Sequence, residues 1–125
     1  SKMHLTKSQM KEMLEMGHSI GTHTHTHVSI SNHEDTKFIE HEFNFPKQIF
    51  EKTFNSNVVS FSYPFGDPTD CFSLKQLQNY HNNYEFIFTV EHKFNTIKTP
   101  KYDLGRYEIS KHDTMDSLDN TFNLM

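Results

Sequence analysis

The sequence predicts an α/β domain in which helices alternate with short strands along 125 residues. Three observations support this fold class. Apolar residues recur at helical spacing over 35–54, apolar runs typical of buried strands occupy 58–62 and 84–90, and turn-forming residues separate these segments. The expected order is α-β-α-β-α-β-β-α, and such alternation is the pattern that builds a parallel sheet or a barrel.

The first helix is expected to begin after Thr6, which can form a capping box with Gln9. Gly17 is expected to end this helix, because glycine readily adopts the left-handed conformation that follows a helix. Its apolar stripe is predicted to be buried and consists of Met10, Met13 and Leu14. Residues 18–23 should follow as a short strand.

The second helix is expected over 35–54. Pro46 lies inside it, and because proline removes a helical hydrogen bond, it should kink this helix or divide it into two. The remaining elements are expected in chain order as a strand at 58–62, a helix at 71–82, a strand at 84–90, an extended segment at 104–109 and a helix at 114–125.

Composition and charge exclude several classes of protein. The net charge is −4 with neutral histidines, and no basic patch stands out, so we expect no nucleic-acid partner. A single cysteine, Cys71, excludes a disulfide within the chain. No apolar run approaches the ~18 residues of a membrane span, and no signal peptide is recognisable, so we expect a soluble chain.

Four of the ten histidines lie within residues 17–31, GHSIGTHTHTHVSIS, and neutral imidazole is a common ligand of zinc. In a straight strand, His23 and His27 would lie roughly 13 Å apart, too far to share one metal ion. A turn after His23 would bring them to about 6 Å. We therefore predict that His23 and His27 form the pair and that His25 points elsewhere. A solvated histidine-rich turn is the alternative; a purification-tag remnant is disfavoured because threonines interrupt the histidines.

These motifs resemble the polysaccharide deacetylase family, metal-dependent enzymes that remove N-acetyl groups from polymers of N-acetylglucosamine. Residues 17–27 are similar to the family segment G-H-x-I-G-x-H-[ST]-x-x-H, and FSYPFG at 61–66 is similar to the aromatic-x-Tyr-Pro-Tyr/Phe-Gly motif of its biofilm-polysaccharide branch. Residues 86–90 and 104–109 resemble the last strands of that branch. The resemblance implies a partial (β/α) barrel with its first strand or strands missing, so that 1–125 form one domain incomplete at its N-terminus.

The resemblance also implies roles for individual residues. His23 and His27 would be two of three protein ligands to a divalent metal, usually zinc. The backbone N–H of Phe65 would stabilise the oxyanion that forms during amide hydrolysis. Tyr63, Pro64 and Phe65 would line a groove for an N-acetylated glycan substrate.

The sequence departs from the family pattern at the other catalytic positions. The opening Thr-Phe-Asp-Asp-Gly motif, which supplies the third ligand and the catalytic base, should lie upstream of residue 1. Ser62 stands where many members carry an arginine that orients the base, and Arg106 could replace it. His112 is the candidate general acid. Within this chain the candidates for a metal-binding carboxylate are Asp67, Asp70 and Asp103.

Three functions remain open from the sequence: a metal-dependent deacetylase, a non-catalytic metal- and carbohydrate-binding remnant of one, and a structural domain with clustered histidines. An incomplete barrel would expose strand edges and apolar faces, which proteins normally cover. We therefore expect a homo-oligomer or contact with a separate N-terminal segment. Family members are often secreted or held at the cell surface and some are cytoplasmic, so the sequence predicts no compartment.

Overall fold

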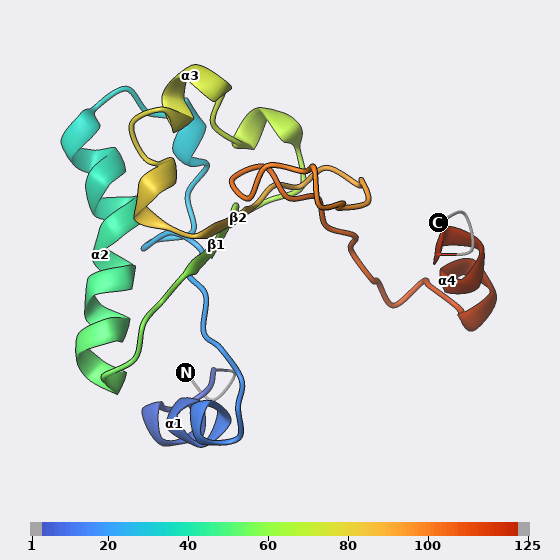
Figure 1. Ribbon diagram of the computed structural model, residues 1–125, viewed down its shortest axis with the longest axis horizontal. Helices are drawn as coiled ribbons and strands as arrows, with labels where there is room; N and C mark the ends of the chain where they lie inside the picture. The colour runs from blue at the N-terminus through green and yellow to red at the C-terminus, as the bar shows by residue number, and fades with distance from the viewer. Residues whose placement is uncertain (1–3, 123–125) are drawn as a thin grey trace.

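A computed structural model describes residues 4–122 (Figure 1). The α-helices are α1 (Lys7–Glu15), α2 (Thr36–Phe54), α3 (Leu74–Leu77) and α4 (Met115–Phe122), and the strands are β1 (Ser60–Ser62) and β2 (Phe86–Phe88). Single 3-10 turns form η1 (Ile30–Asn32), η2 (Pro68–Asp70) and η3 (His81–Asn83). In the described part of the chain, no helix is long and apolar enough to cross a membrane.

A small parallel sheet forms the centre of the fold. β1 pairs with β2 in parallel, with Phe61 opposite Ile87. Thr22 forms a parallel bridge to Phe61 on one side, and Phe88 forms a parallel bridge to Leu104 on the other. Four chain segments thus lie side by side in chain order and run in one direction, so the predicted α/β alternation is confirmed. Closure into a barrel stays a prediction.

Several predicted elements are shorter than expected. Of the strand predicted at 18–23, only Thr22 pairs with the sheet, and the strands predicted at 58–62 and 84–90 each have three ladder residues. The helix predicted at 71–82 is wrong, since only α3 and the single turn η3 form there. Asparagines at 79, 82 and 83 explain this interruption, because their side chains compete with helical hydrogen bonds.

α2 is one continuous helix, so the predicted division at Pro46 is wrong. The Pro46 ring is buried on the same side of α2 as Ile39 and Phe43. The free energy of packing this apolar face offsets the hydrogen bond that proline cannot make. Asn55 ends the helix in the left-handed conformation, with φ 47°.

α1 has the predicted boundaries but not the predicted buried stripe. Thr6 and Gln9 form the expected capping box, and Gly17 adopts a φ of 94°. None of the α1 residues is buried, however, and Met13 is 37% exposed. Figure 1 shows that α1 lies at the end of an extended segment, away from the sheet. Leu14 of α1 lines a small hollow with Phe50 and Phe54 at the end of α2, but this contact leaves the stripe only partly covered.

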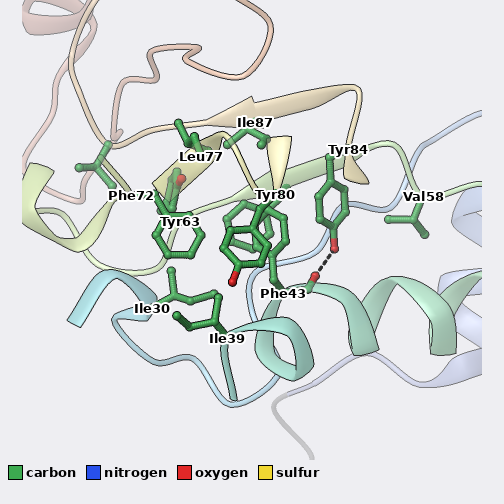
Figure 2. Packing of buried hydrophobic residues seen from close by; sticks show 12 residues of the cluster. Ile30, Ile39, Phe43, Val58, Tyr63, Phe72, Leu77, Tyr80, Tyr84 and Ile87 are labelled. Carbon is green, nitrogen blue, oxygen red and sulfur yellow. Dashed lines mark hydrogen bonds between the residues drawn. The ribbon is translucent and has the colours of Figure 1, made fainter. Parts of the chain in front are cut away.

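The core is an aromatic cluster between α2 and the sheet (Figure 2). Phe43 of α2 is fully buried, and its ring centroid lies 4.5 Å from that of Phe61 and 5.0 Å from that of Tyr84. The Tyr84 hydroxyl donates to the Phe43 carbonyl at 2.6 Å and accepts from the Thr22 hydroxyl at 2.8 Å. This chain of contacts fixes the segment at Thr22, which leads into the histidine cluster, against α2.

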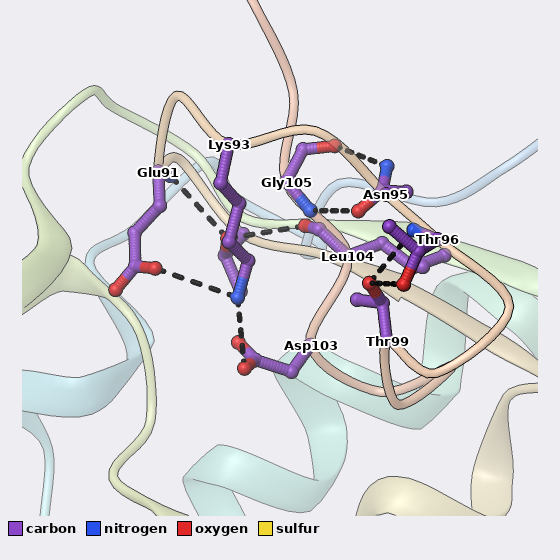
Figure 3. A network of polar contacts seen from close by, with 9 residues as sticks. Glu91, Lys93, Asn95, Thr96, Thr99, Asp103, Leu104 and Gly105 are labelled. Carbon is purple, nitrogen blue, oxygen red and sulfur yellow. Dashed lines mark hydrogen bonds and ion pairs between the residues drawn. The ribbon is translucent and has the colours of Figure 1, made fainter. Parts of the chain in front are cut away.

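The loop after β2 returns to the sheet at Gly105 through a close backbone contact. Asn95 donates to the Gly105 carbonyl at 2.9 Å and accepts from the Gly105 N–H at 2.8 Å (Figure 3). A Cβ at Gly105 would lie 2.4 Å from the Lys93 carbonyl oxygen and 3.0 Å from that of Glu91. Only glycine fits this approach without a shift of the backbone.

We therefore expect Gly105→Ala to lower the free energy of unfolding by about 1–3 kcal/mol, because the added methyl group forces the two loop segments apart. Urea unfolding measures the change. Gly66→Ala is the control, since a Cβ at Gly66 meets no atom within 4 Å, and it should change stability by less than about 0.5 kcal/mol. Equal losses in both variants would contradict this account.

Candidate functional site

The predicted turn after His23 is confirmed. The ring centroids of His23 and His27 lie 4.9 Å apart, with the ring planes at 65°. The chain reverses because Thr24 and His27 adopt left-handed backbone conformations, with φ of 60° and 59°. Such φ values are uncommon outside glycine, so this turn must be held in place by its surroundings.

His25 points away from this pair, as predicted. Its ring lies against α2, 5.1 Å from the ring of His41 and 5.0 Å from that of Phe45. Of the other histidines nearby in sequence, His33 packs on Phe38 at 4.4 Å. The turn therefore separates the alternating histidines into an exposed pair and one that contacts the helix.

The environment of His23 suits a metal ligand. Its Nδ1 lies 2.7 Å from the Ser62 carbonyl oxygen, which can only accept, so Nδ1 carries the proton and Nε2 keeps a free lone pair. Desolvation lowers the pKa of His23 despite the opposing effect of this hydrogen bond, and the charges of His27 and Arg106 lower it further. The neutral imidazole of His23 and the neighbouring ring of His27 fit two ligand positions of a zinc site.

Both rings open into a cleft of about 570 Å³ at the carboxyl ends of the parallel strands, the usual location of ligand sites in α/β sheets. The Phe65 ring lies 4.9 Å from that of His27, so the Tyr-Pro-Phe-Gly turn borders the pair. The residues that line the cleft are His23, His27, Phe65, Gly66, Val90, His92, Arg106 and Glu108.

Arg106 holds the Tyr-Pro-Phe-Gly turn. One of its guanidinium nitrogens donates to the Tyr63 carbonyl at 2.5 Å and to the Phe65 carbonyl at 3.3 Å. Phe65 has a φ of 69°, and within residues 4–122 its N–H has no hydrogen-bond partner. A free backbone donor at the cleft can serve a developing oxyanion. Orientation of a catalytic base by Arg106 stays a prediction.

Of the three residues expected to line a sugar groove, only Phe65 reaches the cleft. Its side chain is 50% exposed, whereas those of Tyr63 and Pro64 are fully buried. The Tyr63 ring packs 5.1 Å from that of Phe61 and 6.0 Å from that of Phe72, and burial raises the pKa of its hydroxyl. Tyr63 and Pro64 thus anchor the turn in the core, and the turn leaves the Phe65 ring at the cleft.

The remaining predicted site residues lie elsewhere. The Asp67 carboxylate caps η2 through Thr69, Asp70 accepts from Ser29, and Asp103 pairs with Lys93 at 2.9 Å. His112 is exposed in the segment before α4 and is not among the residues that line the cleft. Within residues 4–122, no three His, Cys, Asp or Glu side chains form a group that could hold a metal ion.

Three residues at this site were not predicted from the sequence: His92, Glu108 and Glu42. His92 and Glu108 line the cleft, and the ring of His92 stacks on Tyr107 at 5.1 Å. His92 follows β2, and Glu108 follows the segment at Leu104 that pairs with β2. Their positions after the ends of these segments were the sequence signal that could have indicated them. Glu42 accepts hydrogen bonds from the histidine turn. Its signal was an acidic residue on the apolar face of α2, next to Phe43.

Comparison with known proteins agrees with this arrangement. The family model for polysaccharide deacetylase matches residues 1–84. The chain is similar to a polysaccharide deacetylase from Bacillus cereus, with a TM-score of 0.76 and 25% identity, over 94% of this chain and 36% of that one. It is also similar to a Streptococcus pyogenes deacetylase solved in complex with acetate, with a TM-score of 0.77 and 26% identity, over 94% of this chain and 50% of that one.

The chain therefore spans half or less of the length of these solved structures. No curated protein matches it. The family model covers more than half of the chain, and the sequence motifs that suggested the family lie around one cleft. This chain belongs to the polysaccharide deacetylase family.

Proposed function

We propose that this chain contributes the two-histidine part of the active site of a metal-dependent hydrolase, which removes N-acetyl groups from a polysaccharide containing N-acetylglucosamine. The observation that carries the proposal is the pairing of His23 with His27 at 4.9 Å beside the Tyr-Pro-Phe-Gly turn, in an open cleft. Family membership and the acetate-bound relative support the same reaction class.

His23 and His27 would hold a divalent metal ion, most often zinc, through neutral imidazole nitrogens. When bound, such an ion lowers the pKa of a coordinated water and polarises an amide carbonyl. The hydrogen bond from His23 Nδ1 to the Ser62 carbonyl fixes the ring and its tautomer before any ion arrives. The site is thus prepared by β1, whose last residue is Ser62.

In the hydrolysis, water adds to the acetyl carbonyl, the C–N bond breaks, acetate leaves and the sugar amine takes a proton. The Phe65 N–H would donate to the oxyanion that forms, a contribution commonly worth about 3–4 kcal/mol. Arg106 keeps that N–H in place by holding the carbonyls of Tyr63 and Phe65. His92 and His112 are the two candidates for the histidine that donates this proton. His92 lines the cleft, whereas His112 does not.

The third metal ligand and the catalytic base are assigned by family resemblance to a Thr-Phe-Asp-Asp-Gly motif outside this sequence. The sheet offers a place for it. Within residues 4–122, Thr22 pairs with β1 on one side only, so its other edge is open to a further strand. A preceding segment or a second copy of the chain would fill this position.

A non-catalytic metal- and carbohydrate-binding role is the second candidate. It is favoured by one observation: the described residues bring two histidines together but no group of three metal ligands. A cleft that holds an ion and a sugar, without a base to activate water, would bind glycans and leave them intact.

Acetate release from N-acetylglucosamine oligomers tests the two candidates. We expect release when zinc is supplied to the chain joined to the Thr-Phe-Asp-Asp-Gly segment that the resemblance places upstream. The same protein carrying His27→Ala should show only background release, because one ligand is lost. Inactivity of the joined protein with zinc demonstrably bound would overturn the hydrolase proposal and support the non-catalytic role.

A further inference from the structure

Glu42 is a buried carboxylate on α2 that binds the histidine turn. Its side chain is 2% exposed, and it accepts three hydrogen bonds from one short stretch of chain. Oε2 accepts from the backbone N–H of His25 at 3.0 Å and from that of Thr26 at 2.8 Å. Oε1 accepts from the Thr26 hydroxyl at 2.7 Å. Both carboxylate oxygens are thus committed to residues 25 and 26.

These donors lie between the two left-handed residues of the turn. Thr24 precedes them with a φ of 60°, and His27 follows with a φ of 59°. Neither residue is glycine, so this backbone conformation persists only where neighbouring groups hold it. An ionised acceptor that binds two successive N–H groups provides such a hold, because charge-assisted hydrogen bonds are the stronger ones.

α2 keeps the carboxylate in a fixed position. Ile39 and Phe43, on either side of Glu42 in the helix, are buried in the core. The hydrogen bonds of Thr26 and His25 also overcome the effect of desolvation and lower the pKa of Glu42, so the acceptor is ionised at neutral pH. The helix therefore presents a rigid anion to the turn.

We propose that Glu42 is a positioning residue, whose carboxylate folds residues 24–27 so that the rings of His23 and His27 face a common point. Its hydrogen bonds go to the backbone N–H groups of His25 and Thr26 and to the Thr26 hydroxyl, so it acts on the two rings through the backbone between them. The expected effect of Glu42 on metal binding rests on the function proposed above. The expected effect of Glu42 on the shape of the turn does not.

The test is Glu42→Gln in the full chain, with zinc affinity and amide hydrogen exchange as readouts. The amide keeps the size of the side chain but removes the charge and one acceptor oxygen. We expect zinc binding, measured by competition with a coloured chelator, to weaken about tenfold or more, as is typical when a supporting hydrogen bond is lost. The amides of His25 and Thr26 should exchange faster.

Glu51→Gln is the matched control. Glu51 also lies on α2 and also accepts a backbone N–H, that of Val58 at 3.1 Å, but it lies away from the turn. Its variant should change zinc affinity by less than about twofold. Equal weakening in the two variants would show a general effect of α2 stability and would overturn the inference.

Two further outcomes are distinguishable. If the wild-type chain binds no zinc, the two-histidine metal site fails for this chain by itself, and amide exchange alone decides the role of Glu42: unchanged exchange at His25 and Thr26 overturns it. If Glu42→Gln does not fold, Thr26→Ala removes one of the three hydrogen bonds and leaves the carboxylate. Affinity should then fall about threefold to tenfold, and unchanged affinity would overturn the inference.

Discussion

Replacement of His23 or His27 by alanine is expected to abolish measurable zinc binding, with affinity more than about hundredfold below that of the wild type. The loss of a supporting residue near a metal typically lowers affinity 10–100-fold, and the loss of a ligand should exceed that. The two rings lie 4.9 Å apart and face one cleft, so each would supply one ligand to the same ion. Loss of either ring would leave only one of the two histidine ligands. Isothermal titration with zinc measures the effect.

His25→Ala is the control for this prediction. It removes an imidazole from the same five-residue stretch, but that ring packs against His41 and Phe45 on α2. The variant keeps the backbone N–H of residue 25, which donates a hydrogen bond to Glu42. Zinc affinity should therefore stay within a few-fold of the wild type. Equal losses for His23, His25 and His27 would contradict the assigned geometry.

Phe43→Ala is expected to lower the free energy of unfolding by about 3–5 kcal/mol, the usual loss when a fully buried phenylalanine is truncated. Phe43 has no exposed surface, and its ring contacts those of Phe61 and Tyr84, which belong to the central sheet and the segment that enters it. Domains of this size are typically stable by about 5–15 kcal/mol, so the variant should be close to unfolding. Urea unfolding followed by circular dichroism measures the change.

Ile49→Ala is the matched control, because Ile49 lies on the same helix and is 40% exposed. Its truncation should lower the free energy of unfolding by about 1 kcal/mol or less. A comparable loss at both positions would contradict the view that packing of Phe43 against the sheet stabilises α2, because alanine raises the helix propensity at either position.

The sequence predicted those features of the fold that depend on local chemistry. The capping box at Thr6 and the left-handed Gly17 follow from hydrogen bonds and backbone freedom within a few residues. The existence of α2 follows from apolar spacing. Its continuity through Pro46 could not be predicted, because packing of the helix against the sheet offsets the missing hydrogen bond.

Some features of the candidate site could likewise be predicted from the sequence, and others could not. The pairing of His23 with His27 was predictable, since only a turn lets both rings share an ion. The burial of Tyr63 was not, because whether a residue before a turn faces the core or the cleft depends on the twist of the strand that carries it. His92 and Glu108 reach the cleft from segments distant in sequence from the histidine motif.

By itself, the sequence determined the α/β alternation, the helix ends and the two motifs that identify the family, because each is encoded by neighbouring residues. Only the tertiary structure decided which side chains share the cleft and what holds the histidine turn. Glu42 lies 17 residues from His25 in sequence and 16 from Thr26, and no local pattern links them. Their contact exists because α2 packs against the sheet and places a buried carboxylate beneath the turn.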